Sequence, residues 1–318
     1  MVTIKHGWTK PATILFATEC PANEKAFSFA LAQAMESGAD LILFHVYDGT
    51  CAAARKGAAP FAVDYTAARD VKDCFEPLVR RATDLGIACR TVVRSGLAAE
   101  EILGYLNRHP VDRLVMGVHT PGPVGKLLVG SVAETVLRKA DVPVTIVGPY
   151  LVEDTYRNFT TRTILCSLSP HPSSRMVARL AAELAEQKGA RLVLQQVIPP
   201  QECTAALAGR DPRQLEADLV EMIPPRLLST LTVQARVMVG DPTEELLYQS
   251  RVLEANLIVM GAHDASHFAA VTHASVVYKV PAYARCPVMT LSPVMLAGYG
   301  PARANISPAK VNYIAGVL

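Results

Sequence analysis

The sequence has no concentration of charge of one sign. Its 31 Lys and Arg residues are nearly balanced by 29 Asp and Glu residues, so that the formal net charge is +2. No run of basic residues stands out that would attract nucleic acid or an anionic membrane surface. The composition therefore predicts that neither nucleic acid nor membrane is a partner.

Long apolar runs and paired cysteines are also missing. No segment approaches the roughly 20 apolar residues that a membrane helix needs, and the first residues, MVTIKHGWTK, lack the apolar core of a signal peptide. The seven cysteines are an odd number without a C-x-x-C pair, which disfavours a disulfide framework and a zinc site. We expect free thiols in a cytoplasmic protein.

The common motifs of hydrolases and phosphotransferases are absent as well. The chain contains no G-x-S-x-G elbow, no Walker P-loop and no serine–glycine-rich pyrophosphatase loop. A nucleophile at Ser131 or Ser275 would need a paired base, and the sequence identifies none. We therefore do not expect an enzyme, and slow ATP hydrolysis or phosphotransfer ranks last among the functions considered.

The main feature that is present is an internal repeat. A chain of 318 residues is long enough for two domains of about 150 residues each. Four segments recur in the same order: TIL at 13–15 and 163–165, LILFHV at 41–46 as LVLQQV at 192–197, LVMGVH at 114–119 as IVMGAH at 258–263, and ADVPVTIV at 140–147 as ARCPVMTL at 284–291.

Each copy alternates short apolar runs with helical patterns. Apolar residues with helical spacing follow the first strand of each copy, and Gly38 and Gly189 then suit C-terminal caps. Alternating strands and helices predict an α/β fold of two tandem doubly wound parallel-sheet sandwiches. The expected domains are 10–150 and 160–293, with a linker over 148–161. The tail 294–318 lacks clear periodicity and is expected to run over the surface.

The last strands of the two copies, expected at 144–147 and 288–291, are predicted to pair. Such pairing would cover two sheet edges and produce an intramolecular pseudo-two-fold dimer. The sequence leaves open whether full chains also form a homodimer.

The loop between Val115 and Glu134, VMGVHTPGPVGKLLVGSVAE, joins a strand end to a helix start. Ser131 with Glu134 three residues later has the pattern of a capping box. Free N–H groups beside Gly130 could hold an anion there. Capping boxes are also found in helices that bind nothing, so a phosphate site and a simple turn both remain open.

The segments ILFATE, LILFHV and MGVHTPGPVGKLLVGSVAETVLRKADVPVTIV resemble the universal stress protein family. The resemblance covers residues 10–148 and 160–293, so that the chain looks like a tandem member. It implies an adenine nucleotide alpha hydrolase-like fold. Nucleotide-binding members carry G-x2-G-x9-G-[ST], and the first half here has Gly117, Thr120, Gly130 and Ser131 at those positions.

The resemblance implies that the N-terminal half binds ATP, with Mg²⁺ as a companion ion. Glu19 stands in place of the usual Asp, and Thr120 replaces a glycine beside Pro121, which weakens the case for close backbone approach. The implied nucleotide-binding residues are Ala17, Thr18, Glu19, Val46, Met116, Gly117, His119, Thr120, Gly130, Ser131 and Val132.

The second half departs further from the motif. Asp264 places a negative charge in the loop, Ala274 adds a methyl group at the helix start, and Ser169 occupies the carboxylate position. Tyr278 also removes the capping box. We expect this half to be a packing partner or to bind something else.

Two functions follow as hypotheses. The first is a non-catalytic regulatory module that binds an adenine nucleotide in its first half. The alternative is a scaffold or protein-interaction module that binds no nucleotide and has a remodelled cleft.

Several further side chains carry groups with functional chemistry. His263, His267 and His273 suit a polar loop better than a metal site. His45 is expected near a strand end as a packed or hydrogen-bonded histidine. Cys20 and Cys166 are expected near equivalent strand ends and partly exposed, which would suit redox sensing.

Overall fold

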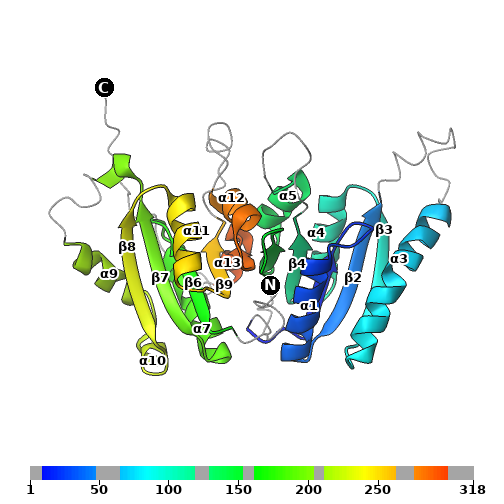
Figure 1. Ribbon diagram of the computed structural model, residues 1–318, viewed down its shortest axis with the longest axis horizontal. Coiled ribbons are helices and arrows are strands. Elements are labelled where there is room, and N and C mark those ends of the chain that lie inside the picture. Colours follow the sequence, from blue (N-terminus) through cyan, green and yellow to red (C-terminus); the bar gives the residue numbers. More distant parts are fainter. Residues whose placement is uncertain are drawn as a thin grey trace.

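The described part of this computed structural model forms one ten-stranded sheet flanked by helices (Figure 1). The structure describes residues 9–47, 65–118, 129–152, 161–203, 211–262 and 276–299. The strand order is β3-β2-β1-β4-β5-β10-β9-β6-β7-β8, so that each half of the chain forms one half of the sheet.

The first half contains five strands and four helices among the described residues. The strands are β1 (Thr13–Ala17), β2 (Asp40–Tyr47), β3 (Cys89–Ser95), β4 (Arg113–Gly117) and β5 (Val144–Val147). The helices are α1 (Glu24–Ser37), α3 (Tyr65–Asp84), α4 (Ala98–Arg108) and α5 (Ser131–Lys139).

The second half repeats this order. Its strands are β6 (Thr163–Leu168), β7 (Arg191–Ile198), β8 (Val233–Val239), β9 (Leu257–Gly261) and β10 (Val288–Leu291). Its described helices are α7 (Ser174–Lys188), η1 (Pro200–Glu202), α9 (Pro212–Val220), α10 (Pro225–Leu228), α11 (Pro242–Val252), α12 (Val276–Tyr283) and α13 (Pro293–Tyr299).

Within each half the strands pair in parallel, as the apolar runs predict. β1 lies between β2 and β4, and β6 lies between β7 and β9.

The first strand of each half is also bound at its start by a side chain at the equivalent position. Asp112 accepts hydrogen bonds from the N–H groups of Ala12 and Thr13, and Asn256 accepts them from Arg162 and Thr163. The predicted tandem doubly wound α/β fold is confirmed.

Helices cover both faces of the sheet, and one apolar core extends through both halves. This core joins residues of α4 and α5 to residues of α11 and α12, including Val136, Leu137, Val277 and Val280. The opposite face has two separate cores, one beneath α1 and α3 and one beneath α7 and α9.

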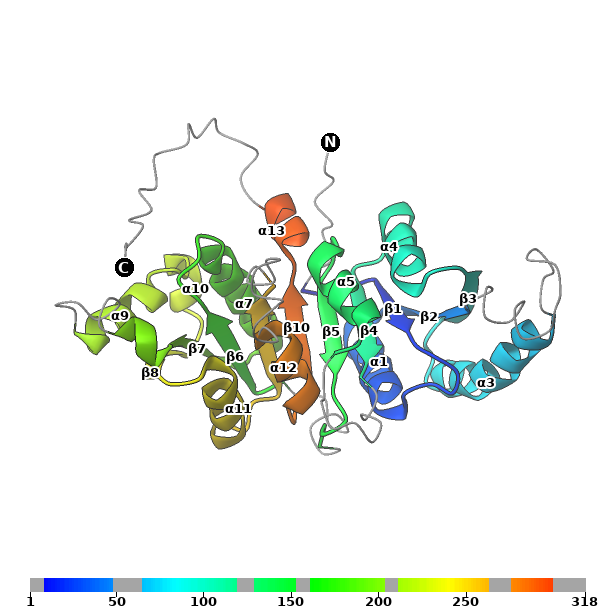
Figure 2. The same cartoon turned by 90° about the horizontal axis from the view of Figure 1, so that it is seen from above.

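The halves meet where β5 and β10 lie side by side at the centre of the molecule (Figure 2). These strands are antiparallel, with Thr145 opposite Met289. The backbone of Gly148 then passes so close to α12 that a Cβ there would lie 2.5 Å from the carbonyl oxygen of Pro281. Because strand pairing removes two sheet edges, it also limits edge-to-edge aggregation.

On the opposite face, polar side chains join α1 to α7. Lys188 forms an ion pair with Glu36, and the side chain of Lys188 is 6% exposed. Arg113 is fully buried and donates a hydrogen bond to Gln33. Desolvation lowers the pKa of both basic groups, that of Arg113 to about 10.

The helix ends confirm one sequence prediction and correct another. Gly38 and Gly189 are C-caps in the left-handed conformation, with φ of 71° and 61°. The expectation of an irregular tail is wrong for residues 293–299, which form α13. Ser292 accepts a hydrogen bond from the N–H of Met295, and the side chain of Met295 is buried. A helix of 7 residues is too short to show periodicity in the sequence.

Candidate functional site

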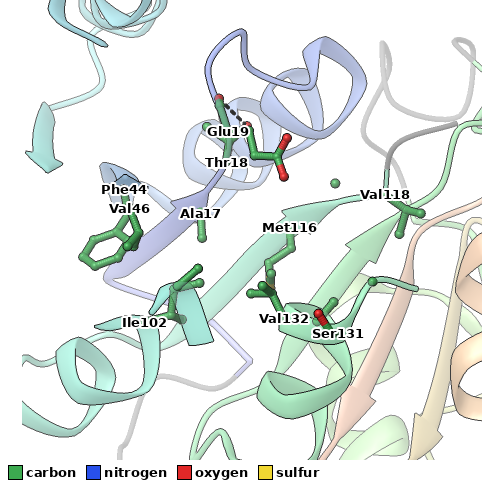
Figure 3. A pocket seen from close by; sticks show the side chains of 14 residues that line it. Ala17, Thr18, Glu19, Phe44, Val46, Ile102, Met116, Val118, Ser131 and Val132 are labelled. Atoms are coloured by element: carbon green, nitrogen blue, oxygen red, sulfur yellow. Dashed lines mark hydrogen bonds between the residues drawn. The ribbon is translucent and has the colours of Figure 1, made fainter. Parts of the chain in front are cut away.

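A pocket of about 370 Å³ opens at the carboxyl ends of the strands of the first half. Ligands of doubly wound sheets bind at this edge. Its wall is formed by the ends of β1, β2 and β4 and by the first turns of α4 and α5 (Figure 3). The lining residues are Ala17, Thr18, Glu19, Phe44, Val46, Ala98, Ile102, Met116, Gly117, Val118, Gly130, Ser131, Val132 and Ala133.

The pocket brings together every predicted site residue that the structure describes. These residues are Ala17, Thr18, Glu19, Val46, Met116, Gly117, Gly130, Ser131 and Val132. His119 and Thr120 lie outside the described residues. Residues separated by about a hundred positions in the sequence therefore surround one space.

One polar side of the pocket is built by the turn after β1. The hydroxyl of Thr18 accepts a hydrogen bond from the N–H of Asn23 at 3.2 Å. The Thr18 carbonyl contacts Nδ1 of His45 at 3.0 Å, which fits the expectation of a hydrogen-bonded histidine. Figure 3 shows Glu19 next to Thr18 and reaching over the pocket. This turn is thus held in place while the Glu19 side chain stays exposed.

The opposite side is the start of α5, where the predicted capping box is wrong. Gly130, in an extended conformation, is the N-cap, and Ser131 is the first residue of the helix without a side-chain capping bond. The first helical hydrogen bond runs from the N–H of Glu134 to the carbonyl of Gly130 at 3.0 Å. The N–H groups of residues 131–133 precede that bond and are the natural donors for an anion.

Apolar side chains form the rest of the wall, and the sequence reasoning missed most of them. The missed residues are Phe44, Ala98, Ile102, Val118 and Ala133. Phe44 shares a strand face with Val46, two residues later, so that strand periodicity identifies it. Ile102 lies in α4, which is outside the motif, so that the motif residues could not predict its place in the pocket.

The charge of the lining is slightly acidic. Among the described lining residues Glu19 is the single ionisable side chain, and none is Lys or Arg. Among the described groups, backbone N–H groups and the dipole of α5 are the ones that would favour an anion, and the dipole contributes roughly 0.3–1 kcal/mol.

Comparison with known proteins identifies the family of this chain. The model of the universal stress protein family matches residues 12–148 and again residues 160–292. The chain belongs to the universal stress protein family. The two matches agree with the two sheet halves seen in the structure.

Individual relatives match over shorter stretches. A universal stress protein of Methanocaldococcus jannaschii is 30% identical over 78 residues, which is 24% of this chain and 48% of the relative. One of Mycolicibacterium smegmatis is 42% identical over 53 residues, 17% of this chain and 41% of the relative. This chain thus spans about half of the length of the relatives that it matches.

Solved structures agree over nearly the whole chain. A universal stress protein of Archaeoglobus fulgidus has a TM-score of 0.65 and 19% identity, covering 87% of this chain and 95% of that chain. A functionally unknown protein of Pseudomonas aeruginosa has a TM-score of 0.60 and 16% identity, covering 92% and 96%. At such identities the likeness shows the fold.

A second pocket, of about 260 Å³, lies at the corresponding place in the second half of this universal stress protein. Ser167, Ser169, Met260 and Gly261 line it at the positions of Ala17, Glu19, Met116 and Gly117. Asp264, Ala274 and Ser275 lie outside the described residues.

The candidate metal ligands and thiols have different outcomes in the structure. No group of three or more His, Cys, Asp or Glu side chains among them is placed to hold a metal ion, and His263, His267 and His273 lie outside them. The expected partial exposure of Cys166 is wrong, because this side chain points into the core beneath α7. Burial raises the pKa of its thiol. Cys20 is half-buried, as expected.

No helix within the described ranges is both long and apolar enough to cross a membrane.

Proposed function

We propose that this universal stress protein is a non-catalytic regulatory module that binds an adenine nucleotide, ATP first of all, in the pocket of its first half. The observation that carries this proposal is the gathering of the described motif residues around one pocket. A volume of about 370 Å³ lies within the range of small-molecule sites.

The lining suggests how each part of a nucleotide would be held. The apolar wall of Phe44, Val46 and Ile102 suits the adenine ring, and the Glu19 carboxylate suits the ribose hydroxyls. The phosphates would meet the start of α5 at Gly130 and Ser131. Mg²⁺ would accompany the phosphates and offset their charge.

The space beside Gly130 supports close approach of the phosphates. A Cβ added at Gly130 would have no heavy atom within 4 Å. Gly130 also has an ordinary φ of −62°, so that its backbone does not require glycine. The space that a side chain at this position would fill therefore belongs to the pocket, because no packed protein atom lies there.

Binding without turnover is proposed because, among the residues that the structure describes, none is placed as a base for the serine at the helix start. Ser131 lies in the first turn of α5, whereas His45 contacts the Thr18 carbonyl with Nδ1 and packs edge-on against Phe75 at 6.0 Å. Acid–base catalysis needs a base within hydrogen-bond reach of its target.

The second half would serve this module as a structural partner. We propose that β5–β10 pairing makes the chain an intramolecular pseudo-two-fold dimer, and that the protein works in the cytoplasm. The continuous core beneath α5 and α12 supports this role, because it links the wall of the first pocket to the second half.

The test is thermal unfolding with and without ATP. Nucleotide at a hundredfold excess over Kd should stabilise the native state by about 2.7 kcal/mol. Glu19→Ala and Gly130→Glu should abolish the shift, and Ser169→Ala, the matched change in the second half, should preserve it. Absence of stabilisation by every adenine nucleotide would contradict the proposal.

The alternative is a scaffold that binds no nucleotide. The lining residues described include no Lys or Arg, which is the observation in its favour. Mass spectrometry of protein purified without added ligand separates the two functions. Adenine nucleotide carried through purification would count against the scaffold.

A further inference from the structure

A small cavity lies between the two halves, on the face of the sheet that α1 and α7 cover. Its volume of about 20 Å³ is enough for one particle the size of a water molecule. It shares no lining residue with either strand-end pocket. The apolar part of its lining consists of Phe29, Leu184, Leu257 and Met289. The rest of the lining is polar.

Both ionisable side chains among the described lining residues are basic. Arg113 of β4 comes from the first half, and Lys188 of α7 comes from the second. Arg113 is 1% exposed, and the side chain of Lys188 is 6% exposed. Desolvation lowers the pKa of Lys188, and the charge of Arg113 lowers it further, whereas Glu36 raises it. Two buried cations thus meet at one cavity.

The nearest carboxylates offset this charge only in part. Glu36 forms the ion pair with Lys188, but it also accepts a hydrogen bond from Nε2 of Gln33 at 3.3 Å, and its side chain is 28% exposed. Asp112 accepts two backbone N–H groups at the start of β1. Neither carboxylate lines the cavity. The charge at the cavity is therefore positive.

Two neutral side chains add hydrogen-bond donors to the lining. Oδ1 of Asn256 accepts hydrogen bonds from the N–H groups of Arg162 and Thr163 at 2.9 and 3.0 Å, so that the Nδ2 group, which can only donate, remains. Thr161 contributes a hydroxyl, which can donate as well. A cavity lined by cations and donors suits an acceptor, and an anion accepts the strongest hydrogen bonds.

The repeat shows that the fold does not require an arginine at this position. Leu257 of β9 occupies the place that Arg113 has in β4, and it lines the same cavity with an apolar side chain. Burying an arginine is costly even when it is paired. A ligand that interacts with the Arg113 charge gives this residue a role beyond packing.

We propose that this cavity binds a single chloride-sized anion between Arg113 and Lys188. The two cations supply the charge, and Asn256 and Thr161 supply neutral donors. A volume of about 20 Å³ is too small for phosphate or a carboxylate, so that the ligand class is a monatomic halide. Because the binding groups come from both halves, the anion would strengthen their pairing. This inference does not depend on ATP binding in the first pocket.

Bromide serves as a crystallographic probe for this site, because it has the charge of chloride and scatters anomalously. Crystals of the full chain grown in sodium bromide would be measured at the bromine absorption edge. An anomalous peak should lie between the side chains of Arg113 and Lys188. A water molecule in the cavity without an anomalous peak would overturn the proposal.

Thermal unfolding tests the site in solution. The full chain would be unfolded in sodium chloride and in sodium gluconate at equal ionic strength, so that charge screening is matched while gluconate is too large for the cavity. Chloride should raise Tm saturably above the value in gluconate, because it binds the native state. Equal Tm values in the two salts at every concentration would contradict a bound anion.

Lys188→Met isolates the site in the same assay. It should raise the chloride concentration needed for the Tm shift by roughly tenfold or more, and Arg113→Leu, which copies Leu257, should do the same. Arg191→Met is the control, because Arg191 is a part-buried arginine that binds groups outside the cavity. This variant should keep the chloride shift.

The proposal is overturned if Lys188→Met keeps the full chloride shift, or if Arg191→Met loses it. Stabilisation by ATP should persist in Lys188→Met. A failure of the anion site is thereby distinguished from a failure of the nucleotide pocket.

Discussion

The side chain of Asn23 lies directly against the α-carbon of Gly117. A Cβ added at Gly117 would lie 2.6 Å from Cγ of Asn23. Asn23 is the N-cap of α1 and accepts a hydrogen bond from the N–H of Ala26 at 3.0 Å, and its Nδ2 donates to the carbonyl of Val118 at 3.3 Å. The first glycine of the family motif therefore makes room for a helix cap as well as lining the pocket.

Gly117→Ala should consequently destabilise the fold. The new methyl group displaces Asn23, and overpacking of this kind costs about 1–3 kcal/mol. The free energy of unfolding in urea measures the effect. Asn23→Ala alone should cost about 1 kcal/mol through the lost cap.

The double variant provides the control for that explanation. With Asn23 already shortened, Gly117→Ala should cost much less than it does alone, because the clash is gone. If the two losses simply add, Asn23 is not the reason for the glycine.

Gly130→Ala should behave in the opposite way. The added methyl group meets no protein atom within 4 Å, and alanine suits a φ of −62°, so that the unfolding free energy should change by less than about 0.5 kcal/mol. ATP affinity should fall, because the methyl group stands where the phosphates approach. If Gly130→Ala lowered the free energy of unfolding by as much as it lowered the free energy of ATP binding, Gly130 would be needed for the fold and not for the ligand.

The ion pair between Glu36 and Lys188 should couple the two halves. Glu36→Ala removes this partner from Lys188, whose side chain is 6% exposed. We expect a loss of about 2 kcal/mol, below the 3–5 kcal/mol of fully buried pairs, because the side chain of Glu36 is 28% exposed. Urea unfolding measures this loss.

A second variant isolates the unpaired charge as the cause. Replacing both partners, by Glu36→Leu with Lys188→Met, should restore most of the stability. A double variant no more stable than Glu36→Ala would indicate that packing, and not charge, holds α1 to α7.

The attachment of α13 to the rest of the fold should depend on Ser292. Its hydroxyl donates a hydrogen bond to the carbonyl of Ala140 and accepts one from the N–H of Met295 at 3.0 Å. Ser292→Ala removes both bonds and should cost about 1–2 kcal/mol. Hydrogen exchange of the α13 amides should accelerate, and unchanged exchange would contradict the docking seen here.

Stability should fall in alkaline solution. Burial raises the pKa of the Cys286 thiol from 9.0 to about 12, so that the native protein keeps a proton that the unfolded chain loses. The stabilisation is complete below pH 9 and is lost as pH rises toward 12, at about 1.4 kcal/mol per pH unit for one such group. Other groups titrate in the same range.

Comparison with Cys286→Ala isolates the thiol from those groups. Between pH 9 and 10 the variant should lose stability less steeply than the unsubstituted protein, as measured by urea unfolding at each pH. Parallel slopes would show that the thiol does not titrate with a raised pKa.

Much of the fold could be predicted from the sequence because its signals are local. The repeated apolar runs, the helical spacing and the glycines at helix ends each act within a few residues, and Gly38 and Gly189 are caps as expected. The motif, whose spacing is intact, also identified site residues, and those that the structure describes line one pocket.

The remainder depends on packing that the sequence does not display. Ser131 lies one position inside its helix because Gly130 takes the cap, and helix boundaries are the least certain part of sequence-based assignment. The run LVLQQV indicates a strand, but it does not reveal that Gln195 is buried at a position where Phe44 packs in the first half. The burial of Cys166 and the docking of α13 have the same origin, in contacts distant along the chain.

Isothermal titration of the full chain with ATP and Mg²⁺ tests the central claim most directly. One ATP should bind per chain, and Gly130→Glu should abolish the heat of binding while Ser169→Ala preserves it. Two ATP molecules per chain, or no binding at any concentration up to the millimolar range, would contradict the account.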